Sequence, residues 1–366
     1  MTNAQTAPQE PHAIRVVHLR GGLRAIDLGD GRVSIEVDPD KVFAEFQRPP
    51  YGQLYGVLGR HGMKPVGVDI SSHRMQADGL MPPDWRVFIA GNGFYISDVE
   101  QDWGNVRNVE GQKDAALVDL SLRFQTYLRL LLLRIRHLSE AYHQALRAKV
   151  LSAEAFGREA TPGLFAGAYL TDIAAAIHAF LADASGLRDL IAEALWRLVM
   201  KQEDGAVTVL SSFLKKARSH DDPLVAEVVA AGGEGGWLKT LTTLRNAITH
   251  VAPLAQSQEL HMMDLRQATF GDIAAPVLHF PLLTGAGEVR TRPALFAGSP
   301  REMMQARLEE YRAFVAGSGD ALDYCLQTLD RLADLAARVR VAAGLQAEMM
   351  VFDQSNIIGG VTTRWL

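Results

Sequence analysis

The helical part of this chain is best defined by one stretch, LKTLTTLRNAITH, which runs from Leu238 to His250. A glycine-rich break at residues 232–236 precedes it, and Pro253 follows it. Between these breaks, apolar residues recur at three- and four-residue steps, at Leu238, Leu241, Leu244, Ile248 and Val251. This period predicts an amphipathic helix whose apolar stripe faces a core.

Three polar residues lie beside that stripe: Arg245, Asn246 and His250. On a helix, Asn246 and His250 lie about 40° apart, whereas Arg245 and His250 lie about 140° apart and flank a groove. An imidazole can move protons near neutral pH, and a guanidinium can hold a phosphate with two hydrogen bonds. Together these groups suit cleavage of a phosphodiester without a metal, with the 2′-hydroxyl of RNA as the nucleophile.

The pattern Arg245-Asn246-x-x-x-His250 on a helix resembles the Arg-polar-x-x-x-His motif of HEPN domains. The resemblance implies a metal-independent endoribonuclease in which two helical bundles dimerise and both motifs meet in one cleft. It also implies a role in toxin–antitoxin systems or antiphage defence, with a cognate antitoxin or regulator as a partner. Carried over, Arg245 holds the phosphate, His250 transfers the proton, and Asn246 orients either group.

Other basic residues offer weaker signals. Lys215, Lys216 and Arg218 end another expected helix and are the second candidates for contact with RNA. They also suit the negative end of a helix dipole. A looser Arg-x6-His pair, Arg136 and His143, also fits the motif spacing, but we treat it as a chance match and not as the functional motif. Its helix, expected from 114 to about 151, is rich in basic residues, which form either an RNA-facing stripe or a solvated face.

Composition narrows the function classes. The chain has 366 residues, 48% of them hydrophobic, and a net charge of −5, which argues against a generally basic nucleic-acid coat. Cys325 is the only cysteine, and His61, His73 and Asp69 lack the spacing of a standard metal site. We therefore expect no metal and no cofactor. The apolar runs are too short for a membrane span and the start lacks a signal-peptide core, so a cytoplasmic protein is expected.

The chain divides by period into an α+β arrangement. Residues 1–13 are expected to be a flexible tail, and residues 14–105 a small, mostly-β domain of unassigned role. Residues 110–345 are expected to form a larger all-α bundle with a β-hairpin inserted at 274–296, and residues 346–366 a tail. Within the first domain the pattern predicts a helix over 39–46, strands over 53–58 and 93–99, and a polar hinge over 102–113.

Inside the bundle, Gly186 is expected to separate two helices, and residues 257–270 are expected to be helical. Two function classes remain open beside the ribonuclease. One is a HEPN-like bundle that binds RNA, a nucleotide or a partner without catalysis. The other is a structural protein in which Arg245 and His250 only stabilise packing.

Overall fold

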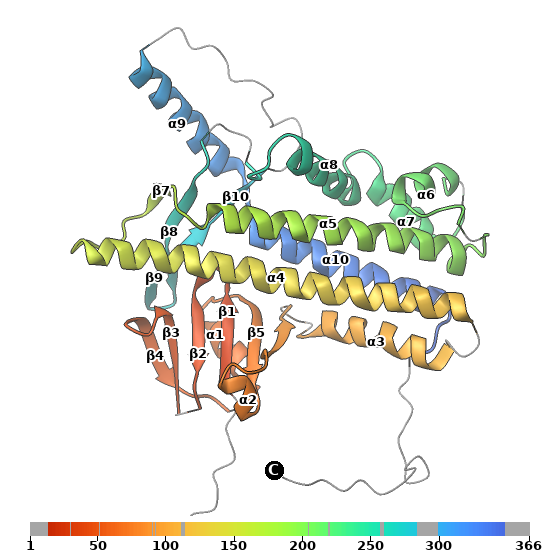
Figure 1. Cartoon of the computed structure of the whole chain (residues 1–366), viewed down its shortest axis with the longest axis horizontal. Coiled ribbons are helices and arrows are strands. Elements are labelled where there is room, and N and C mark those ends of the chain that lie inside the picture. Colours follow the sequence, from red (N-terminus) through yellow and green to blue (C-terminus); the bar gives the residue numbers. More distant parts are fainter. Residues whose placement is uncertain are drawn as a thin grey trace, which may run out of the picture.

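The computed structural model describes residues 14–347, except 30, 51, 90, 92, 111–113, 204, 219, 257–259 and 284–298. It shows an antiparallel sheet at the N-terminal side, followed by long helices, as Figure 1 shows. This confirms the mixed α+β class. The expected tail at 1–13, the expected tail at 346–366 except for residues 346 and 347, and the second half of the expected hairpin lie outside the described residues.

The sheet has six strands in the order β4-β3-β2-β1-β5-β6 and is antiparallel throughout. Its strands are β1 (Ile14–Leu19), β2 (Arg24–Asp27), β3 (Arg32–Asp38), β4 (Lys41–Gln47), β5 (Pro65–Ser71) and β6 (Asp84–Val87). Between them lie η1 (Arg20–Gly22), α1 (Leu54–Arg60) and α2 (Arg74–Ala77). Strand register divides the side chains between an apolar face, which includes Val17, Ala25 and Val68, and a more polar face.

The remaining helices lie above the sheet, beside it or away from it (Figure 1). They comprise α3 (Tyr95–Glu110), α4 (Ala115–Ala155), α5 (Leu170–Ala194) with a π turn at Leu195–Val199, α6 (Leu210–Lys216), α7 (Pro223–Gly232), α8 (Trp237–His250), α9 (Pro300–Gly317) and α10 (Ala321–Ala342). α4 packs on one side against η1, β6 and α3, and on the other side against α5. α5 in turn carries α8, as the stacked layers in Figure 1 show. One cluster of buried apolar side chains runs through the sheet and the helices.

Two expectations in the first hundred residues were wrong because short local patterns misled them. The segment after Pro39-Asp40 is the strand β4, since these two residues turn the chain back on β3. The segment from Leu54 is the helix α1, in which Leu54 and Leu58 are fully buried one turn apart.

The expected strand at 93–99 and hinge at 102–113 were also wrong over the described residues. Apart from a single bridge between Ile89 and Gly93, this segment forms α3. Its buried residues Ile96, Val99, Trp103 and Val106 follow a helical period. Trp103 stacks on Phe124 of α4 with ring centroids 4.0 Å apart, so α3 lies with the helices.

The helix expected at 257–270 was wrong as well over its described residues, because Met263–Phe270 is the strand β8. It pairs with β9 (Ile273–His279) through the two-residue turn Gly271-Asp272, a composition typical of tight hairpins. β7 (Gly163–Phe165) adds a third strand, and β10 (Pro281–Leu282) pairs with β11 (Gly319–Asp320). The hairpin in this region therefore begins earlier in the chain than expected.

Gly186 does not break the helix it was expected to end, because α5 continues through it to Ala194. With its π turn, this helix (Leu170–Val199) is long and apolar enough to cross a membrane. Half of the apolar window is buried inside the protein, where α5 packs against α4, α8 and α10. The same composition is therefore expected of a core helix.

Candidate functional site

The helix that carries the expected motif forms as predicted. α8 spans Trp237–His250, and Leu238, Leu241, Leu244 and Ile248 of its apolar stripe are buried. Val251 was wrongly placed in that stripe, since it is 48% exposed and lies just after the helix ends. The stripe packs against α5, and the opposite side of α8 faces solvent.

The glycine-rich break sets where α8 begins. Gly236 precedes the first helical residue, and a Cβ there would lie 2.1 Å from the carbonyl oxygen of Ala231. Gly235 has a φ of +75°, which side chains disfavour. These glycines allow α8 to pack back against α7, with which it is in contact.

The three motif residues all reach the solvent-exposed surface of α8. Asn246 and His250 are exposed, and Arg245 is partly exposed. Arg245 Nη1 donates a hydrogen bond to Asn246 Oδ1 at 3.1 Å. Within the part of the chain that the structure describes, neither Arg245 nor His250 forms an ion pair. A guanidinium and an imidazole are thus presented to solvent, and no acid among the described residues neutralises them.

Hydrogen bonds fix this end of α8 on α5. His178 Nε2 lies 2.7 Å from the carbonyl oxygen of Pro253, which holds the turn after His250. Nearer the middle of the helix, Arg188 Nη1 donates to Thr242 Oγ1 at 2.6 Å. His178 is thus an interface histidine that positions the motif helix.

The basic residues of α4 are not free to form an RNA-facing stripe. Five of its arginines form ion pairs with acids on other elements: Arg123 with Glu193, Arg129 with Glu100, Arg134 with Asp183, Arg136 with Asp69, and Arg147 with Asp38. The hydrogen-bonded Arg123 guanidinium lowers the pKa of Glu193. These arginines instead join α4 to its neighbours. This role differs from both expected alternatives, the RNA-facing stripe and the solvated face.

The second set of expected RNA contacts lies elsewhere. Lys215 and Lys216 end α6, and Arg218 follows it; all three are exposed. Lys216 Nζ donates to the carbonyl oxygen of Ala206 at 2.8 Å and lies 5.3 Å from the ring centroid of Trp196. In Figure 1 α6 lies beyond the end where α8 begins. Arg245 and His250 belong to the second half of α8. One chain therefore does not gather both sets around one phosphate.

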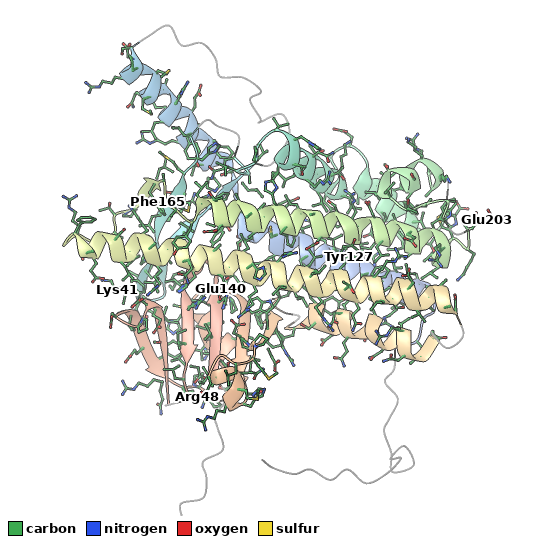
Figure 2. The ribbon with its side chains drawn as sticks, viewed as in Figure 1. Lys41, Arg48, Tyr127, Glu140, Phe165 and Glu203 are labelled. Atoms are coloured by element: carbon green, nitrogen blue, oxygen red, sulfur yellow. The ribbon has the colours of Figure 1, made fainter. Side chains whose placement is uncertain are left out.

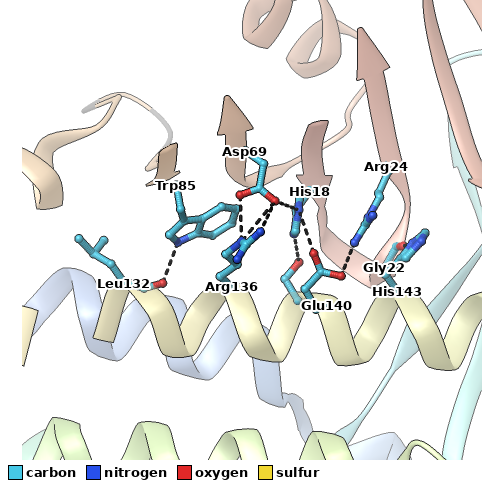
Figure 3. Close-up of polar contacts among 10 residues, drawn as sticks. His18, Gly22, Arg24, Asp69, Trp85, Leu132, Arg136, Glu140 and His143 are labelled. Atoms are coloured by element: carbon cyan, nitrogen blue, oxygen red, sulfur yellow. Dashed lines mark hydrogen bonds and ion pairs between the residues drawn. The ribbon is translucent and has the colours of Figure 1, made fainter. Parts of the chain in front are cut away.

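A second cluster of polar groups was missed from the sequence. His18 of β1, Asp69 of β5 and Glu140 of α4 meet where the sheet contacts α4, as Figure 3 shows. His18 Nε2 lies 3.4 Å from Asp69 Oδ2 and 3.7 Å from Glu140 Oε1. His18 is fully buried, and this burial lowers its pKa.

Two arginines complete this cluster. Arg136 binds Asp69 with two nitrogens, at 2.9 Å and 3.0 Å, and Arg24 pairs with Glu140 Oε2. Burial raises the pKa of Asp69, but the neighbouring side chains of His18 and Arg136 outweigh it and leave the pKa lowered. The set-aside pair Arg136 and His143 therefore faces the sheet, since His143 Nδ1 lies 2.9 Å from the carbonyl oxygen of Gly22.

The sequence held a partial signal for the cluster. Strand β1 carries His18 at a buried position, and Arg136, Glu140 and His143 recur at helical steps on α4. A polar stripe on a long helix and a polar residue in a strand can indicate a charged interface between layers. The pairing itself joins positions 121 residues apart, such as His18 and Ser139, and no local period encodes that contact.

Comparison of the chain with protein-family models, with curated proteins and with solved structures gives no match.

Proposed function

We propose that this chain is a metal-independent endoribonuclease of the HEPN type, with Arg245 and His250 at its active site. The observation that carries the proposal is the solvent-facing pair itself. Within the described residues the buried and half-buried arginines of α4 have acidic partners, whereas Arg245 has only its neighbour Asn246. An unneutralised guanidinium and an imidazole exposed on the same helix suit an anionic substrate.

In the proposed reaction, the 2′-hydroxyl of one nucleotide attacks the adjacent phosphorus and the bond to the 5′-oxygen breaks. A histidine accepts the proton of the 2′-hydroxyl or supplies one to the leaving 5′-oxygen. Arg245 stabilises the negative charge that develops on the non-bridging oxygens. The products are a 2′,3′-cyclic phosphate and a 5′-hydroxyl.

The geometry of α8 favours a site shared by two copies of the chain. Arg245 and His250 lie about 140° apart around the helix and about 7.5 Å apart along it, so their side chains diverge. A phosphate held between an arginine of one copy and a histidine of the other avoids this divergence. A two-fold axis beside the exposed side of α8 would bring the two motifs together.

The test is cleavage of a mixed RNA pool in EDTA by the wild type and by His250→Ala, with thermal melting of both proteins. We expect cleavage by the wild type alone, at matched melting temperature, with cyclic-phosphate ends. Lys239→Ala, an exposed change on the same helix, serves as the control and is expected to leave cleavage intact. Absence of cleavage by the wild type would rule out the nuclease, and RNA binding retained by His250→Ala would then indicate a binding protein.

A further inference from the structure

We propose that His18, Asp69 and Glu140 bind one divalent transition-metal ion, such as Zn²⁺, where the sheet meets α4. The site is separate from Arg245 and His250 and does not depend on the proposed nuclease activity. One imidazole nitrogen and two carboxylate oxygens form a ligand set that suits Zn²⁺ and related ions, whereas Mg²⁺ prefers oxygen ligands alone.

The spacing of the ligand atoms fits such an ion. His18 Nε2, Asp69 Oδ2 and Glu140 Oε1 all lie within 4.8 Å of one another, and two of the separations are 3.4 Å and 3.7 Å. Ligands bound tetrahedrally at about 2.0–2.1 Å are separated by about 3.4 Å. The side chains therefore need only small shifts to bind an ion between them.

The nitrogen that would bind the ion already faces both carboxylates, at 3.4 Å from Asp69 Oδ2 and 3.7 Å from Glu140 Oε1. His18 is 1% exposed, and its Nε2 has no hydrogen-bond partner among the described residues. Leaving a buried imidazole nitrogen without a partner is unfavourable. A metal ion between Nε2 and the two carboxylates would satisfy it.

Outer contacts hold all three ligands in place, as Figure 3 shows. His18 Nδ1 lies 3.2 Å from Ser139 Oγ, which directs Nε2 toward the carboxylates. Glu140 binds Arg24 through Oε2, so its Oε1 remains available, and Arg136 orients Asp69. Metal-binding histidines and carboxylates usually have such outer partners.

The two arginines also limit the affinity. They already balance the charges of Asp69 and Glu140, so a bound ion adds positive charge to a partly buried site. A water or hydroxide as a fourth ligand would reduce that charge, and the Glu140 side chain, 34% exposed, provides access from solvent. We therefore expect binding in the micromolar range, weaker than in a closed structural zinc site.

Bound metal would join the two halves of the fold. His18 and Asp69 lie on paired strands of the sheet, and Glu140 lies on α4, above the sheet in Figure 2. The ion would thereby cross-link the sheet to the helix that supports α5 and, through it, α8. We infer a structural role in which metal occupancy stabilises the contact between the sheet and the helices.

The experiment is calorimetric titration of chelator-stripped, tag-free protein with ZnCl₂, and in a parallel arm with MgCl₂. The wild type is expected to bind one Zn²⁺ per chain and no Mg²⁺, and its melting temperature is expected to rise with Zn²⁺. Co²⁺ at the same site is expected to give visible absorption bands that Zn²⁺ removes. Failure of the wild type to take up Zn²⁺ would overturn the proposal.

Three variants locate the ion. His18→Gln and Glu140→Gln are expected to weaken Zn²⁺ binding by at least about tenfold. His137→Gln, an exposed change on the same helix, is expected to bind as the wild type does. If His18→Gln does not fold, Zn²⁺ binding by Glu140→Gln tests the site, because Glu140 is partly exposed and its substitution is expected to be tolerated. Undiminished binding by Glu140→Gln, or an equal loss in His137→Gln, would assign the ion to another site and overturn the proposal.

Discussion

The ring of Tyr127 on α4 occupies the space that a side chain at Gly186 on α5 would need. A Cβ at position 186 would lie 2.5 Å from Cε1 and 2.7 Å from Oη of Tyr127. Gly186 is therefore a packing glycine inside a continuous helix, and it lets α4 and α5 approach closely where Tyr127 lies between them (Figure 2).

Gly186→Ala is accordingly expected to destabilise the protein. Alanine in a helix interior gains about 1 kcal/mol over glycine. Overpacking against a rigid ring costs about 1–3 kcal/mol, so a net loss on the order of 1 kcal/mol is expected. Denaturant unfolding of the purified variant measures the difference in free energy.

Gly104→Ala provides the matched control. Gly104 lies inside α3, and a Cβ there would meet the end of the Gln125 side chain at 2.5 Å. Because a flexible amide can move away, this change is expected to be neutral or stabilising. Equal destabilisation of both variants would show that Tyr127 does not set the cost at Gly186.

The long helices could be predicted from the sequence because each carries a sustained period. α4 and α8 formed close to the expected limits, since their apolar residues repeat over several turns. α1 and β4 could not be predicted, because segments this short depend on the surface they pack against. The β8–β9 turn, Gly271-Asp272, was a local signal that the helical interpretation of residues 257–270 overlooked.

The two candidate sites also differ in how far the sequence predicts them. Arg245, Asn246 and His250 form a local motif on one helix, so the sequence alone places them together. His18, Asp69 and Glu140 come together only through strand pairing and the docking of α4, which join distant parts of the chain. Such contacts are set by tertiary packing, and no spacing in the sequence records them.

Stability is expected to fall as the pH is lowered from about 6.5 toward 4, because of His143. Burial lowers the pKa of His143 from 6.5 to about 4. In this interval the unfolded chain binds a proton that the folded protein does not, so the free energy of unfolding decreases as the pH falls. The shift corresponds to about 3 kcal/mol over the full interval.

Denaturant unfolding at several pH values, in buffer with a chelator, measures this effect. His143→Asn can still donate to the carbonyl oxygen of Gly22. In this variant the slope of the free energy of unfolding against pH is expected to decrease by up to the contribution of one bound proton. An exposed change on the same helix, His137→Asn, should leave most of the dependence in place. Identical slopes for the wild type and His143→Asn would contradict the assignment.

The pair between Arg15 and Asp27 is expected to be essential to the sheet. Arg15 donates two hydrogen bonds to Asp27 Oδ2, at 3.0 Å and 2.6 Å, and both side chains are almost fully buried. Asp27→Asn leaves a guanidinium in the interior with reduced compensation, and a loss of about 3–5 kcal/mol is expected. Urea unfolding compares it with the wild type.

An exposed pair on the same sheet provides the comparison. Arg32 and Glu45 lie 3.4 Å apart with side chains 70% and 51% exposed, so Glu45→Gln is expected to change stability by less than about 1 kcal/mol. A small effect of Asp27→Asn would mean that solvent or another group satisfies the Arg15 guanidinium, since Arg48, whose Nε lies 3.0 Å from Asp27, loses the same anionic partner.

Mixing two inactive variants tests whether the active site is shared between chains. If the arginine of one copy works with the histidine of the other, a dimer of Arg245→Ala with His250→Ala keeps one intact pair out of two. Random exchange makes half of the dimers mixed, so about a quarter of wild-type cleavage is expected to return. Each variant alone is expected to be inactive, with wild-type stability because both side chains lie on the outer side of α8. Co-expression with two different affinity tags isolates the mixed species if the subunits exchange slowly. If the isolated mixed dimer stays inactive while wild-type dimers purified in the same way cut RNA, Arg245 and His250 of a single copy act together and the shared site is wrong.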